Sequence, residues 1–160
     1  MDQPGFQYGL HSVKKLTSYL NSIDSIGIKS LEEEKIAVNK SYWISFNYEE
    51  GIISIKFSAD FLSRTETPEP LKLFGAVVNC DFKLVGFLEI LKKDEKGQVD
   101  LPDDLLVTLL SVSYSTTRGI LAAQTAGTDY SNIFLPLVGI SEFSLVLKKP
   151  VENSTAKQES

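Results

Sequence analysis

The sequence has a single cysteine, Cys80, and a single histidine, His11, among its 160 residues. One cysteine allows neither an internal disulfide nor a cysteine zinc cluster. The histidine stands near the start of the chain with no nucleophile signature, and the sequence also lacks a Gly-rich phosphate loop. We therefore expect no catalytic residues, no metal site and no cofactor, and a protein that is not an enzyme.

Positive charge is scarce as well. Lysine and arginine number 16 against 21 aspartates and glutamates, so the net charge is −5. A nucleic-acid partner would require a basic stripe, and we expect none. The first ten residues, MDQPGFQYGL, contain neither the basic cluster nor the apolar run of a signal peptide. The sequence therefore predicts a cytoplasmic protein.

One long segment is almost free of charge. From Leu105 to Thr128 the only charged residue is Arg118. The segment is long enough to span a bilayer. An arginine near its centre, however, costs about 2.5–3.5 kcal/mol on insertion scales, and several serines and threonines remove much of the apolar gain. We therefore expect no integral membrane segment.

The length predicts one domain, residues 1–150, followed by a polar tail, residues 151–160, that we expect to be disordered. Alternation of apolar and polar residues predicts strands at Ser25–Leu31, Ser41–Tyr48, Ile52–Phe61 and Leu71–Phe87. Glu49-Glu50-Gly51 is typical of a hairpin turn. Apolar residues at helical spacing predict a short helix over His11–Ile23.

Two more helices follow the strands. Pro102-Asp103-Asp104 is typical of a helix start, and Gly127 of a helix end, which predicts a helix from about Asp103 to Ala126. A short final helix is predicted over Glu142–Lys148. The fold class is therefore α+β, with a four-stranded antiparallel sheet packed against a long helix and a short C-terminal helix.

The long helix has two kinds of face. Its apolar face for the sheet consists of Leu105, Leu106, Leu109, Leu110, Val112, Ser113, Thr116, Thr117, Ile120 and Leu121. The remaining face is small and uncharged, with Thr108, Ser111, Ser115 and Ala122, where a surface helix would carry Lys and Glu. Such residues allow close approach, so we predict an oligomer interface formed by these four and Arg118. The alternative is a central helix of one larger core.

The segment Asp129–Ile140 is apolar although it lies between helices. An apolar loop either covers the core or forms a binding surface. The predicted peptide-binding residues are Trp43, Ile133, Phe134, Leu135, Leu137 and Val138, with Trp43 on the second face of its strand. The alternative is that this loop only covers the sheet edge.

The order of these elements resembles the SecB family of bacterial export chaperones. The resemblance is most specific in Tyr114–Phe143, where Tyr114 and Arg118 precede Gly127-Thr128 and a Leu-x-Pro-type segment, Phe134–Val138. The chain departs from the family at Ser115–Thr117, where SecB proteins have a proline. It also has a shorter second helix, interrupted by Lys148-Lys149-Pro150, and a tail with Lys157 in place of an acidic one.

The resemblance implies a dimer of dimers that acts as an ATP-independent holdase. Its clients would be unfolded preproteins, delivered to a SecA-like translocation motor. Some SecB relatives instead guard the antitoxin of a toxin–antitoxin pair. A structural or adaptor protein is a further alternative, and an enzyme ranks third.

Acidic residues are the predicted contact for a basic, SecA-like motor. They are Glu49, Glu50 and Asp81, together with Glu32–Glu34. One surface ion pair contributes only about 0–1 kcal/mol, so several would have to act together. The alternative is a solvated acidic edge that only prevents aggregation.

Overall fold

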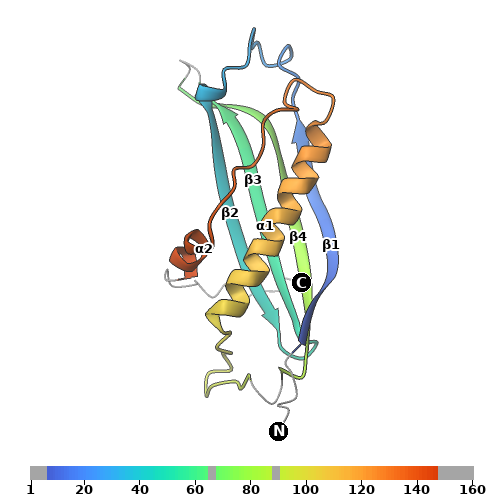
Figure 1. Ribbon diagram of the computed structural model, residues 1–160, viewed down its shortest axis with the longest axis vertical. Helices are drawn as coiled ribbons and strands as arrows, with labels where there is room; N and C mark the ends of the chain where they lie inside the picture. The colour runs from blue at the N-terminus through green and yellow to red at the C-terminus, as the bar shows by residue number, and fades with distance from the viewer. Residues whose placement is uncertain (1–6, 65–67, 88–90, 148–160) are drawn as a thin grey trace, which may run out of the picture.

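The computed structural model describes residues 7–64, 68–87 and 91–147. Its elements are β1 (Gln7–Leu20), the short 3-10 helix η1 (Glu33–Lys35), β2 (Ile36–Asn47), β3 (Ile52–Ser63), β4 (Leu71–Val85), α1 (Asp103–Thr125) and α2 (Ile140–Leu147). The strands form one antiparallel sheet in the order β1-β4-β3-β2 (Figure 1). The predicted α+β fold is confirmed. The predicted tail, residues 151–160, lies outside the described residues.

The molecule has two layers (Figure 1). Helix α1 lies along one face of the sheet and contacts β3 and β4. The chain then turns back and runs beside α1 towards α2, which also contacts α1. Among the described residues, no helix covers the opposite face. The sheet therefore has an inner face, covered by α1, and an outer face.

The inner face forms the core, as the alternation of apolar and polar residues in β2, β3 and β4 predicts. Ile44, Ile55 and Cys80 pair across β2, β3 and β4, and Cys80 is fully buried. The buried inner residues of β3 and β4 are Ile53, Ile55, Phe57, Ala59, Phe61, Phe74, Ala76, Val78, Cys80, Phe82 and Leu84. Glycine is required at Gly51 in the β2–β3 turn, because its φ is 65° and a side chain there would collide with the Phe87 ring.

The predicted helix over His11–Ile23 is wrong, because His11–Leu20 belong to β1 and the strand ends before Asn21. The pairing of β1 with β4 shifts between Leu10 and Ser12 and again between Lys15 and Thr17. Each bulge adds one residue to β1, so inner-facing residues recur every two or three positions instead of every two. Val13 pairs with the inner residue Cys80, whereas Leu16 is the extra residue of the second bulge, so their three-residue spacing comes from the bulge and not from a helix.

The predicted strand over Ser25–Leu31 is also wrong. Residues 23–27 form a turn, and Gly27 has a φ of 75°, which lies outside the extended region. Ile26 and Ile28 pack against the core from this connection. The fourth strand of the predicted sheet is therefore β1, at the edge beside β4.

Helix α1 is long and apolar enough to cross a membrane by length and composition alone, but 44% of its most apolar window is buried. Its buried face includes Val107, Tyr114 and Thr125, whereas Val112 is exposed. The buried face of α1 is thus rotated about the helix axis, relative to the predicted one, so that it includes Tyr114 and excludes Val112. Ser113 and Thr117 are buried and donate their hydroxyls to the Leu109 and Ser113 carbonyls at 2.9 Å each.

The outer face carries a polar network around Asp81. Its carboxylate accepts hydrogen bonds from Ser12 at 2.7 Å, Ser54 at 2.6 Å and Asn79 at 2.7 Å. Partial burial acts to raise the pKa of Asp81, but these hydrogen bonds and the charge of Lys14 hold it below its ordinary value. The ionised carboxylate therefore joins three strands of the sheet.

We predict that Asp81→Asn lowers the free energy of unfolding at pH 7 by about 1 kcal/mol, because the charge-assisted bonds are lost at a partly exposed site. A depressed native pKa contributes stability above the unfolded pKa and loses it as the pH falls through the native pKa. The difference between wild type and variant should therefore shrink below about pH 4. Urea denaturation at several pH values measures it. Asp24→Asn, at an exposed carboxylate, is the control and should show no such difference.

Candidate functional site

Two side chains of α1 hold the backbone of the segment between α1 and α2, which we call the return loop (residues 126–139). The Tyr114 hydroxyl donates a 2.6 Å hydrogen bond to the Pro136 carbonyl. Arg118 Nε donates a 2.8 Å hydrogen bond to the Leu135 carbonyl. Tyr114 and Arg118 are four residues apart and share one helix face, so both reach the same stretch of loop.

Tyr114 is fixed on several sides. Its ring packs edge-on against Phe57 and Phe143, with centroids 5.3 and 5.7 Å away. Burial raises the pKa of its hydroxyl, Glu142 raises it further, and Arg118 partly offsets both. The hydroxyl therefore stays protonated at neutral pH and remains a hydrogen-bond donor to the loop.

The return loop alternates between buried and exposed side chains. Leu135 is 1% exposed and belongs to the core, whereas Phe134 is 51% exposed and Leu137 is 82% exposed. Ile140, at the start of α2, is 68% exposed. Because the backbone is held through the 135 and 136 carbonyls, the neighbouring large apolar side chains are directed away from the core.

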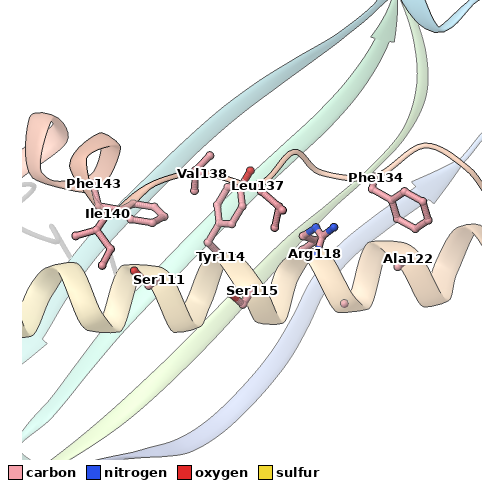
Figure 2. Close-up of a pocket in the computed structure, with 11 residues that line it drawn as sticks. Ser111, Tyr114, Ser115, Arg118, Ala122, Phe134, Leu137, Val138, Ile140 and Phe143 are labelled. Atoms are coloured by element: carbon pink, nitrogen blue, oxygen red, sulfur yellow. The ribbon is translucent and has the colours of Figure 1, made fainter.

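A groove runs between α1 and the return loop, with a cavity volume of about 460 Å³ (Figure 2). We call it the α1 groove. Its lining residues are Ser111, Tyr114, Ser115, Arg118, Gly119, Ala122, Phe134, Leu137, Val138, Ile140 and Phe143. One wall is the small-residue side of α1, and the other consists of large apolar side chains. Arg118 is the only charged residue in the lining.

The structure brings two separately predicted sets of residues into this one groove. Of the predicted oligomer interface, Ser111, Ser115, Arg118 and Ala122 line it. Of the predicted peptide-binding residues, Phe134, Leu137 and Val138 line the opposite wall. Thr108 is exposed on α1 outside the lining, and Ile133 packs partly buried against the core.

Other predicted site residues lie elsewhere. Trp43 is 50% exposed and pairs with Lys56, whose ammonium lies 5.1 Å from its ring centre on the outer face. The structure therefore does not bring Trp43 to the groove. Glu49 and Glu50 lie in the β2–β3 turn, and Lys83 donates a hydrogen bond to the Glu50 carbonyl.

Sequence reasoning did not assign Tyr114, Gly119, Ile140 and Phe143 to a site, although all four line the groove. The four-residue spacing of Tyr114 and Arg118 was an available signal, since an aromatic and a cation on one helix face share a neighbour. Within residues 7–64, 68–87 and 91–147, no group of three or more His, Cys, Asp or Glu is placed to hold a metal ion.

We predict that Tyr114→Phe lowers the free energy of unfolding by about 1 kcal/mol, because one hydrogen bond to the loop is lost. Hydrogen exchange in residues 133–139 should also accelerate. Tyr42→Phe is the matched control, since the Tyr42 hydroxyl has no hydrogen-bond partner among the described residues. Equal losses for the two variants would show that the bond to Pro136 does not fix the loop.

Neither a protein-family profile nor a curated protein sequence matches this chain. Among solved structures, it is similar to the SecB-like chaperone of Mycobacterium tuberculosis in complex with a ChAD peptide from the HigA1 antitoxin. The two share 6% identity over 82% of this chain and 90% of the other, with a TM-score of 0.50. A protein of unknown function from Streptococcus agalactiae aligns at 10% identity over 83% of this chain and 99% of the other, with a TM-score of 0.31. The similarity to the Mycobacterium tuberculosis structure shows that the chain has a SecB-like α+β fold.

Proposed function

We propose that this protein is an ATP-independent molecular chaperone, a holdase that binds non-native polypeptides in the α1 groove. The observation that carries the proposal is the apolar wall of the groove, with Leu137, Ile140 and Phe134 exposed beside a helix face whose only charged lining residue is Arg118. A soluble domain rarely exposes large apolar side chains together unless they bind something.

The energetics suit a holdase. Full burial of one leucine or phenylalanine side chain contributes about 1.5–3 kcal/mol, and part of this offsets the cost of ordering the client. Several such contacts give useful affinity without reading a defined sequence. The core position of Leu135 and the partly buried position of Ile133 make them anchors of the loop, while Phe134, Leu137 and Val138 are the proposed contacts.

Two roles fit a cytoplasmic holdase with this fold. In the first, unfolded preproteins are held for export and passed to a SecA-like motor through Glu49, Glu50 and Asp81. The outer face beside them, however, also carries Lys14, Lys56 and Lys83, which weakens its attraction for a basic partner.

The second role is a chaperone dedicated to an antitoxin. The structural similarity to a SecB-like chaperone in complex with an antitoxin peptide favours this role. A pull-down from native cytosol separates the two. Recovery of a motor with unprocessed secretory precursors supports export, and recovery of one dominant small partner supports the antitoxin role.

We further propose a homo-oligomer, a dimer of dimers, in which α1 forms one contact. From Thr108 to Ala123 the outward face of α1 is small and uncharged, with exposed Thr108, Val112, Ser115, Gly119 and Ala123. The free edge of β1 is a second candidate contact. Leu10 and Val13 are exposed there, and among the described residues no strand pairs with β1 on the edge opposite β4. A dimer of dimers requires two such interfaces.

Leu137→Glu is predicted to raise, by about tenfold, the chaperone concentration needed to suppress aggregation of a denatured client, because a charge replaces an apolar contact. Light scattering of two unrelated clients measures the effect. Leu145→Glu is the matched control, since Leu145 is 63% exposed but lies outside the groove lining. If wild type protects no client, the holdase proposal is wrong. If both variants lose activity equally, the site is not the groove.

Ser115→Arg is predicted to reduce the assembly from four copies of the 17.7-kDa chain to two, because a large charge enters the proposed α1 contact. Light scattering coupled to size exclusion measures the mass. Ser45→Arg, at an exposed position of β2, should leave the mass unchanged. A wild-type protein that runs as a monomer at micromolar concentration would contradict the proposed oligomer.

A further inference from the structure

Arg118 has more hydrogen-bonding capacity than its contact with the loop uses. A guanidinium offers five N–H donors, and within the part of the chain that the structure describes only Nε is used, for the Leu135 carbonyl. Among the described residues, no carboxylate forms an ion pair with Arg118. Figure 2 shows the guanidinium between Leu137 and Phe134, inside the groove.

Fixing a backbone carbonyl does not require a positive charge. Tyr114 performs the same task at Pro136 with a neutral hydroxyl. The other charges near the groove are Lys40, whose ammonium lies 5.7 Å from the Tyr114 ring centre, and Glu142, which acts on the Tyr114 hydroxyl from α2. Lys40 and Glu142 have opposite charges and lie outside the lining, so the only charge within the groove lining is the positive charge of Arg118.

We propose that the α1 groove selects extended non-native segments that carry an aspartate or glutamate side chain between apolar residues, and that the Arg118 Nη atoms bind that carboxylate. The inference rests on the proposed chaperone function and defines its client class. Arginine suits this role because its planar fork matches a carboxylate in a bidentate manner.

The position of Arg118 indicates an internal side chain as the carboxylate source. Phe134 lies on one side of it and Val138, Ile140 and Phe143 on the other (Figure 2). A client with apolar residues on both sides of the acidic one can therefore use both parts of the apolar wall. A chain terminus at Arg118 would leave one part unused.

Binding of fluorescent apolar peptides that differ at one central position tests the proposal by anisotropy. The wild-type protein should bind the Glu peptide about fivefold more tightly than the Gln peptide, and the Lys peptide most weakly. The preference should decline as salt is raised. Arg118→Gln keeps an amide donor for the Leu135 carbonyl but removes the charge, so it should bind Glu and Gln peptides equally. Lys40→Gln is the control for general charge and should retain the preference.

The possible outcomes distinguish a failure of the carboxylate proposal from a failure of the chaperone proposal. Equal binding of the Glu and Gln peptides by wild type overturns the carboxylate proposal and leaves the chaperone proposal intact, whereas binding of none of the peptides overturns both. A preference that survives in folded Arg118→Gln, or disappears in Lys40→Gln, shows that Arg118 is not the recognising group. If circular dichroism shows that Arg118→Gln does not fold, the relative affinities of wild type for the Glu, Gln and Lys peptides still test whether the groove prefers a carboxylate.

Discussion

Two hydrogen bonds from one face of α1 determine what the return loop presents to solvent. Tyr114 and Arg118 hold the carbonyls of Pro136 and Leu135, at 2.6 and 2.8 Å. With the backbone fixed there, Leu135 enters the core, while Phe134 and Leu137 remain on the surface. A loop free to move would bury these side chains against the sheet, because burial of apolar area is the dominant favourable term. The apolar groove therefore depends on two polar contacts.

The close approach of α1 to the sheet supports this arrangement. Ser113, Thr117 and Thr125 are buried where long side chains would separate the layers. Each hydroxyl donates a hydrogen bond to a backbone carbonyl four residues earlier in the helix, so the burial of these three side chains leaves none of their hydroxyl donors unpaired. The unusual composition of the helix thus serves two surfaces: hydroxyl residues fit against the sheet, and small residues line one wall of the groove.

The sequence predicts the parts of this fold whose pattern is local. Strict alternation in Ile52–Phe61 identifies a strand, and Pro102-Asp103-Asp104 marks the start of α1 within a residue. The pattern fails in β1, where two bulges disturb the period of two. It also cannot show that residues of α1 and of the return loop face each other, because that contact depends on the reversal of the chain after Thr125. The two halves of the groove were therefore predicted as separate surfaces.

Hydrogen–deuterium exchange with and without an unfolded client tests the central claim most directly, because it locates the bound chain on the folded protein. The account predicts slower exchange in residues 133–139 and in residues 111–122 of α1 when a client is present, with β2 around Trp43 unchanged. Protection confined to β2 and the outer face of the sheet, with the return loop unaffected, would contradict the claim that the α1 groove is the binding site.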